Sequence, residues 1–221
     1  TQAAVFGPDG TVMQPYDALA KKHIVAIRGR FRPVTNIFLD MLKKGQAQFE
    51  QESDVDDDKI CVLSELTLRS LEDGSHHINE KDFLDRVDIL CSLGQTVLIS
   101  NFHEYFKLVA FLSQFSRLKM ALIMGMPNLE YIFEEKHYTN VDGGILTAFA
   151  NLFGHNIKLY LYPTIDDQGA VLNLKSFKPE PHLKGLYQYL IDNSKLEDIK
   201  KSDEKLMNIR TDKVLDMIQQ G

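Results

Sequence analysis

Cysteine is scarce in this sequence, and the positions of the two cysteines exclude a metal site or a redox pair built from thiols. The 221 residues contain only Cys61 and Cys91, and each lies within an apolar run. The two have neither the spacing of metal ligands nor that of a redox pair. We therefore expect two buried free thiols in a protein of the reducing cytoplasm, with no metal site.

Long apolar runs and an excess of basic charge are also absent. No stretch approaches the ~20 apolar residues that a membrane span requires, and no signal peptide is recognisable, so no membrane association is expected. The formal net charge of −6 argues against nucleic acid as a partner, because duplex affinity depends on the neutralisation of phosphates.

The residues that are abundant are those of a globular core. Hydrophobic residues make up 44% of the chain, with 13 Phe and 8 Tyr, and a chain of this size buries roughly 70% of its unfolded surface. Residues 1–20, with several turn-forming residues and little periodicity, are interpreted as a leader or linker. Residues 21–221 then form the domain, with a helical closing segment from about residue 182. The first residue, Thr1, is not methionine, as expected of a piece of a longer protein.

Five continuous apolar runs predict strands. Continuous rather than alternating hydrophobicity indicates burial on both faces, as in a parallel sheet. The expected strands are His23–Gly29, Lys59–Leu66, Gln95–Asn101, Lys119–Gly125 and Asn156–Tyr162.

Helical patterns separate these runs, at residues 34–50, 80–93 and 102–115. Asn79 and Asn101 precede the second and third of them as capping residues. Strands that alternate with helices, joined by right-handed crossovers, predict an α/β fold. We expect a doubly wound, mostly parallel, five-stranded sheet of the Rossmann-like kind with C-terminal helices.

Ligands of such sheets bind outside the carboxyl ends of the strands. The candidate positions are Gly29–Asn36, Ser64–Thr67, Ser100–His103, Gly125–Asn128 and Tyr162–Thr164. The first of these turns is the most informative, because a glycine lets the chain pass close to a nucleotide and the following helix offers free N–H groups to phosphate.

This turn resembles that of the nucleotidyltransferase superfamily, which includes the nicotinate-mononucleotide and phosphopantetheine adenylyltransferases. Their pattern is G-x-F-x-P-x-[HT]-x-G-H, which Gly29, Phe31, Pro33 and Thr35 match in register; Asn36, Leu39 and Asp40 extend the likeness to the phosphopantetheine type. The resemblance implies that Gly29, Phe31, Pro33, Thr35 and Asn36 surround a nucleotide. It also implies ATP with Mg²⁺ as the cofactor of an active enzyme.

Two positions of the turn depart from that pattern. Ile37 replaces the second glycine, and Phe38 replaces the final histidine, which in the family stabilises charge on the triphosphate. Phenylalanine donates no hydrogen bond, and the loss of one such stabiliser costs ~3 kcal/mol of transition-state binding. We therefore expect degenerate catalytic motifs.

The superfamily has a second motif near its end, roughly I-S-[SG]-T-x-[LVI]-R. Ile209, Val214 and Ile218 match its apolar frame, and the trailing Gly221 matches as well. Arg210 occupies the serine position, and we assign it to phosphate binding. The whole chain is also similar to a family of longer bacterial proteins that carry the names nicotinate-nucleotide adenylyltransferase and TonB-dependent receptor. The receptor name does not fit, because the sequence lacks many strands with alternating lipid-facing residues.

Basic residues gather before and within the first turn. Five occur between Lys21 and Arg32, with no acidic residue among them. If Arg28, Arg30 and Arg32 leave the strand on one side, they form a forked site for phosphate. The alternative is a solvated strand end whose arginines pair with the acidic loop at residues 54–58.

Three other features complete the candidates. His103 is the best general base, with Arg30 as its catalytic partner; the alternative for His103 is an exposed residue in the first turn of a helix. Glu65 ends the second strand, where a carboxylate would hold ribose hydroxyls or magnesium, or serve the structure alone. The polar stretch 134–144, ending in Gly143 and Gly144, is either a lid or a plain connection.

Three functions are consistent with these features. The first is a domain that binds a nucleotide or phosphorylated metabolite with little or no transfer activity. The second is an active adenylyltransferase in which His103 or the arginines replace the lost histidine. The third is a scaffold or homo-oligomerisation module of a longer protein.

Overall fold

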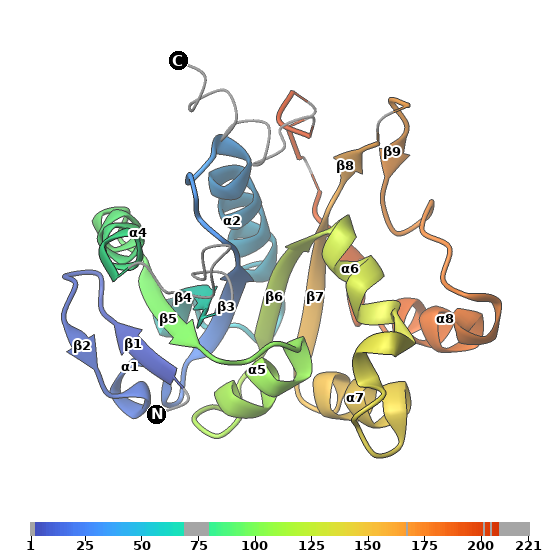
Figure 1. Cartoon of the computed structure of the whole chain (residues 1–221), viewed down its shortest axis with the longest axis horizontal. Coiled ribbons are helices and arrows are strands. Elements are labelled where there is room, and N and C mark those ends of the chain that lie inside the picture. The colour runs from blue at the N-terminus through green and yellow to red at the C-terminus, as the bar shows by residue number, and fades with distance from the viewer. Residues whose placement is uncertain (1–2, 69–79, 167, 201, 204, 208–221) are drawn as a thin grey trace.

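The computed structural model describes residues 3–68, 80–166, 168–200, 202–203 and 205–207, and it is an α/β fold with one large sheet (Figure 1). The sheet has eight strands in the order β10-β7-β6-β3-β4-β5-β1-β2. Strands β10 to β5 in this order run parallel, whereas β1 and β2 are antiparallel. The α/β class and the mostly parallel sheet are confirmed, but the prediction of five strands is wrong.

All five predicted strands are present at the centre of the sheet. Their residues are almost all buried, as expected for strands covered on both faces. Their bounds are His23–Arg28 for β3, Ile60–Thr67 for β4, Thr96–Ser100 for β5, Met120–Gly125 for β6 and Ile157–Tyr162 for β7.

The three unpredicted strands lie at the two edges of the sheet. Residues 3–20, which fall within the segment interpreted as a leader, contain β1 (Ala3–Phe6), β2 (Val12–Met13) and a short helix, α1 (Pro15–Leu19). At the other edge, β10 (Leu196–Asp198) pairs with β7. Each of these strands is at most four residues long and only partly buried. Such short edge strands carry no apolar run for the sequence to reveal.

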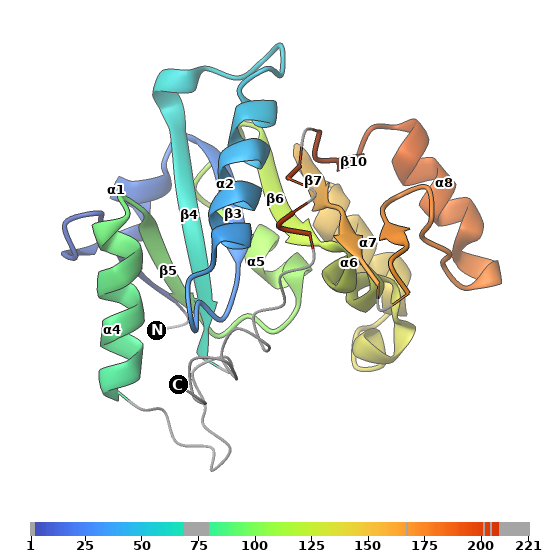
Figure 2. The same ribbon diagram turned by 90° about the horizontal axis from the view of Figure 1, so that it is seen from above.

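Helices cover both faces of the sheet, as Figure 2 shows from above. On one face, α2 (Asn36–Phe49) and α4 (Glu80–Ser92) bury their apolar side chains together with Val25, Ile123 and Tyr160. The other face is covered by α1 and four further helices. These are α5 (Tyr105–Leu112), α6 (Met126–Phe133), α7 (Gly144–Phe153) and α8 (Lys184–Asp192). No helix in the described residues is both long and apolar enough to cross a membrane.

Helix α5 begins later than predicted. The sequence suggested a start directly after Asn101, but the first helical residue is Tyr105 and Glu104 occupies the capping position. Two hydrogen bonds hold the intervening residues out of the helix: the Phe102 N–H donates to Ser100 Oγ at 3.3 Å, and Arg28 donates to the His103 carbonyl at 2.8 Å. The predicted cap of α4, Asn79, lies outside the described residues.

The remaining connections are short. Residues 134–144 form the connection between α6 and α7, in which Gly143 and Gly144 have positive φ angles of 79° and 60°. The small elements are a β8–β9 hairpin (Thr164–Ile165 and Val171–Leu172) and three short 3-10 turns, η1 (Asp57–Lys59), η2 (Glu135–Tyr138) and η3 (Pro181–Leu183).

A polar network ties the loop after α2 to strands β6 and β7. Glu52 accepts hydrogen bonds from Tyr160 Oη at 2.6 Å and Lys119 Nζ at 3.0 Å, and it pairs with Lys158. Lys158 also pairs with Glu197 of β10 at 3.0 Å. Burial alone would raise the pKa of Glu52, but the hydrogen bonds from Lys158, Tyr160 and Lys119 outweigh it and lower the pKa from 4.5 to about 2.

This lowered pKa predicts a loss of stability in acid. A carboxyl group whose pKa falls on folding stabilises the protein fully above its unfolded pKa, and that contribution disappears as the pH falls through the folded pKa. We expect the urea midpoint to decrease between pH 4.5 and about pH 2, and the decrease to be smaller in Glu52→Gln. The control is Glu180→Gln, which alters an exposed carboxylate. Equal pH dependence of both variants and the parent would contradict this role of Glu52.

Candidate functional site

The order of the strands reverses between β3 and β6. From β3 the chain proceeds in one direction along the sheet to β4 and β5, and from β6 in the other direction to β7 and β10. The loops that follow β3 and β6 therefore lead away from each other at the carboxyl ends of these strands. In folds of this kind a crevice opens there. Two adjoining cavities occupy this point.

The first, which we call the polar cavity, has a volume of about 530 Å³. Its lining comes from the ends of β3 and β4, from the loop before α5 and the first residue of α5, and from α6. The residues are Arg28, Gly29, Arg30, Thr67, His103, Tyr105, Asn128 and Tyr131.

The second, which we call the apolar cavity, has a volume of about 320 Å³ and lies against the start of α2. It shares Arg28, Gly29, Arg30 and Asn128 with the polar cavity, so the two are adjacent. Its other lining residues are Ile27, Phe31, Pro33, Thr35, Ile37, Phe38, Met41, Gly125, Pro127 and Thr164.

The turn after β3 is shaped by aromatic packing. Phe31 has a φ angle of 50° and is buried, and its ring meets that of Phe38 edge to face at 4.8 Å. A Cβ atom at Gly29 would lie 2.8 Å from the Phe31 ring, which is closer than packed carbon atoms approach. Gly29 is therefore required for the Phe31 ring to fold back over the strand end.

Arg28 and Glu65 form a buried ion pair beneath the polar cavity. They are direct partners in the parallel register of β3 and β4. Arg28 donates from Nε and Nη2 to the two Glu65 oxygens at 2.7 and 2.9 Å, and the Glu65 side chain is fully buried. Burial opposes the charged guanidinium, but the charge and hydrogen bonds of Glu65 outweigh it, so the pKa of Arg28 is raised.

This pair is the centre of a larger cluster. Ser100 Oγ, at the end of β5, donates to Glu65 at 2.5 Å, and the Arg28 guanidinium lies 4.5 Å from the centre of the Tyr105 ring. Burial raises the pKa of Tyr105 to about 12, so its phenol stays neutral. Because both Glu65 oxygens accept hydrogen bonds within the cluster, the geometry favours the structural interpretation of this carboxylate over ribose or magnesium binding.

The three arginines of the turn do not form one fork. Arg28 is paired with Glu65, and Arg32 lies 3.6 Å from Asp82 and lines neither cavity. Neither pairs with the acidic loop. Arg30 is exposed and lines both cavities, and its carbonyl accepts a hydrogen bond from Arg86 at 3.1 Å. In the described part of the chain, no acidic side chain forms a salt bridge with Arg30.

The other predicted site residues are distributed unequally. His103 is exposed at the polar cavity, and Gly29, Phe31, Pro33 and Thr35 line the apolar one. Asn36 is exposed as the first residue of α2 but does not line either cavity. Arg210, with the rest of the second motif, lies outside the described residues.

Sequence reasoning did not identify Tyr105, Tyr131 and Met41 as site residues. Tyr105 and Tyr131 line the polar cavity, and Met41 lines the apolar one. All three belong to helices whose apolar stripes also build the core, so no local signal separates them from buried residues. Tyr105 and Tyr131 lie soon after the ends of β5 and β6, which is the only indication that the sequence contains for them, and Met41 lacks even that.

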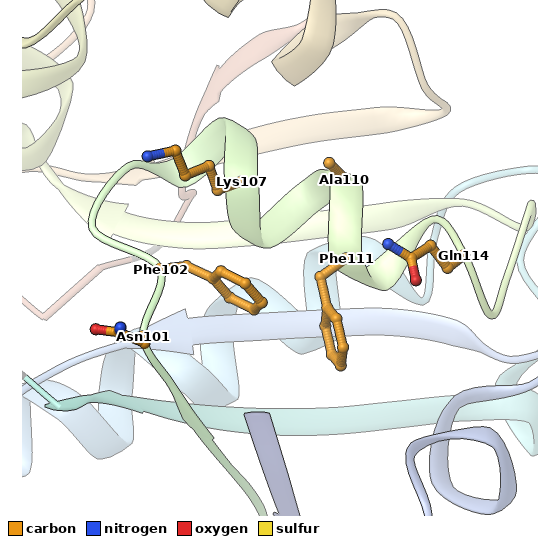
Figure 3. Close-up of a pocket in the computed structure, with 6 residues that line it drawn as sticks. All are labelled: Asn101, Phe102, Lys107, Ala110, Phe111 and Gln114. Atoms are coloured by element: carbon orange, nitrogen blue, oxygen red, sulfur yellow. The ribbon is translucent and has the colours of Figure 1, made fainter. Parts of the chain in front are cut away.

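Two further cavities lie away from the strand reversal. One, of about 360 Å³, flanks α5, where Phe102 and Phe111 face each other with ring centres 5.2 Å apart (Figure 3). Another, of about 310 Å³, lies between α6 and the segment that follows β9. Neither shares a lining residue with the polar or the apolar cavity.

The residues of the site do not fit a magnesium ion. Hard cations take carboxylate oxygens, but among the described residues no Asp or Glu lines either cavity. The described residues also contain no group of three or more His, Cys, Asp and Glu side chains that could hold a metal. Comparison with protein-family models and with curated protein sequences found no match for this chain.

Proposed function

We propose that this domain binds a nucleotide or a phosphorylated metabolite at the strand reversal and does not transfer adenylyl groups. The observation that carries the proposal is the pair of adjoining cavities between the ends of β3 and β6, with Arg30 on the lining of both. Sites of this kind are concave, mostly apolar and equipped with a few polar groups that fix the ligand.

The strand order supports this proposal. Numbered along the chain, the parallel strands follow the order 3-2-1-4-5-6, which is that of doubly wound, Rossmann-like dinucleotide-binding domains. Those domains bind their ligands where the order reverses. The turn that resembles the nucleotidyltransferase pattern, from Gly29 to Thr35, occupies the corresponding place here.

The proposed lack of transfer activity rests on Phe38 and on the lack of carboxylates in the described lining of the two cavities. Phe38 stands where the pattern has a histidine, is only 8% exposed and packs against Phe31. It offers no hydrogen bond to a developing charge, a loss of ~3 kcal/mol or about a hundredfold in rate. The described lining of the cavities also includes no carboxylate for the magnesium ion that accompanies ATP in such reactions.

Thermal-shift and calorimetric titration with ATP, nicotinate mononucleotide and dinucleotides tests binding. A ligand at a hundred times its dissociation constant should add ~2.7 kcal/mol to the free energy of unfolding. We expect Arg30→Ala to weaken binding about tenfold or more, because it removes the cation shared by both cavities. The control is Arg117→Ala, which alters an exposed arginine just before β6, at the amino ends of the parallel strands and thus away from the cavities.

Two outcomes would overturn the proposal in different ways. If none of these ligands raises the unfolding temperature, binding at the strand reversal is wrong. If the chain releases pyrophosphate from ATP and a mononucleotide, and Arg30→Ala abolishes that release, the domain is an adenylyltransferase after all.

A further inference from the structure

The two cavities differ in chemistry, and the difference specifies the kind of ligand. The apolar cavity is lined mainly by the hydrophobic side chains of Ile27, Phe31, Ile37, Phe38, Met41 and Pro127. The polar cavity instead offers His103 and Tyr131, and Asn128 lines both cavities. A group in the apolar cavity loses its contacts with water and gains contacts with apolar side chains. This transfer is favourable for a ring and unfavourable for a phosphate chain.

The charge at the border of the cavities limits the ligand further. Arg28 is a lining residue, but its charge is balanced by the buried Glu65 carboxylate, and its Nη1 donates to the His103 carbonyl. Arg32 lines neither cavity. Arg30 is thus the cation at the border whose charge is not balanced by a salt bridge within the described residues. A single guanidinium matches one phosphate group, whereas a triphosphate would bring several negative charges to an apolar lining.

We infer that the site takes a nucleoside monophosphate, with its ring in the apolar cavity and its phosphate at Arg30. The sugar hydroxyls then face His103 and Asn128 in the polar cavity. The volume of the apolar cavity, about 320 Å³, is close to the lower limit of ~300 Å³ for small-molecule sites, so one ring system occupies it. This inference rests on the proposed function and narrows its ligand class.

Calorimetric titration of the unmodified chain with matched ligands tests the charge requirement. The nucleosides are adenosine, guanosine, cytidine, uridine and nicotinamide riboside. For each of them we compare the affinities of the nucleoside, its 5′-monophosphate and, where it exists, its triphosphate. Inorganic phosphate alone is measured as well. We expect at least one monophosphate to bind ten times more tightly than its nucleoside, its triphosphate and phosphate. Because no variant is involved, this comparison does not depend on whether an altered chain folds.

Two variants test the placement of the ligand. Arg30→Ala should reduce the affinity of the monophosphate to that of the nucleoside, while Met41→Gln should weaken the binding of both about fivefold by making the apolar cavity polar. Leu39→Gln is the matched control, since Leu39 lies on the same helix, is 40% exposed and does not line either cavity. We expect it to leave both affinities unchanged.

The outcomes separate this inference from the proposed function. If a triphosphate binds as tightly as its monophosphate or more tightly, and Arg30→Ala weakens it, the strand reversal binds nucleotides but the inference is wrong. If the monophosphate binds and Met41→Gln behaves like Leu39→Gln, the ring lies elsewhere and the placement is wrong. If no compound in the series binds, the proposed function fails as well.

Discussion

Replacement of Arg28 by alanine is expected to destabilise the fold by about 3–5 kcal/mol. The variant leaves the Glu65 carboxylate fully buried without its cation, and a buried charge that loses its partner is costly. It also removes the hydrogen bond to the His103 carbonyl. Urea unfolding of the variant and the parent at pH 7 measures the difference.

Arg32→Ala is the matched control for this prediction. Arg32 belongs to the same turn, but its side chain is 53% exposed and its distance from Asp82 is 3.6 Å. An exposed ion pair of this kind contributes only ~0–1 kcal/mol. If the two variants lost similar stability, the pairing of Arg28 with Glu65 would not be a principal support of the strand ends.

A double variant distinguishes the cost of a lone charge from the value of the pair. In Arg28→Met with Glu65→Leu, apolar side chains of comparable length replace both charges, and such replacements are often neutral or stabilising. We expect the double variant to recover most of the stability lost in Arg28→Ala. Ser100 Oγ then loses its acceptor, which limits the recovery by about 1 kcal/mol.

The central strands of this fold were predictable from sequence because a strand that is buried on both faces needs a continuous run of apolar residues. In β3, Ile24, Val25 and Ala26 are all buried, and a strand with helices on both sides requires such a run. The strands at the edges of the sheet have no such run. Strand β10 has one buried residue, Leu196, followed by Glu197 and Asp198, and it exists because β7 offers a free edge for pairing. Pairing of this kind is a tertiary property.

The site could be predicted in its location but not in its chemistry. Strand ends mark the working edge of a parallel sheet, so the turn after Arg28 could be identified from its glycine and its helix start. The state of Arg28 could not be, since Glu65 lies 37 residues away and the two meet only through the register of β3 and β4. Likewise, Tyr131 reaches the cavity from α6 because of how that helix packs.

The effect of Gly45→Ala in α2 on the free energy of unfolding is expected to change sign with the residue at position 123. A Cβ atom at Gly45 would lie 2.4 Å from Ile123 Cδ1 and 2.7 Å from its Cγ1, and Ile123 is almost fully buried in β6. Alanine improves helix propensity by ~1 kcal/mol, but overpacking of a rigid core costs ~1–3 kcal/mol. Gly45→Ala in the parent chain should therefore be destabilising by up to about 2 kcal/mol.

The same substitution should be stabilising once Ile123 is shortened. Ile123→Ala alone leaves a cavity and costs about 2–5 kcal/mol. In that background the new methyl group of Gly45→Ala fills part of the cavity, and alanine keeps its higher helix propensity, so we expect a gain of about 1 kcal/mol or more in the free energy of unfolding.

Gly185→Ala in α8, where a Cβ atom would meet nothing within 4 Å, is the control and should have the same effect in both backgrounds. Urea unfolding of the full double-mutant cycle measures the coupling. Additive effects of Gly45→Ala and Ile123→Ala would mean that α2 does not rest on β6 through this contact, and the helix that begins at the candidate site would have to be held against the sheet by other residues.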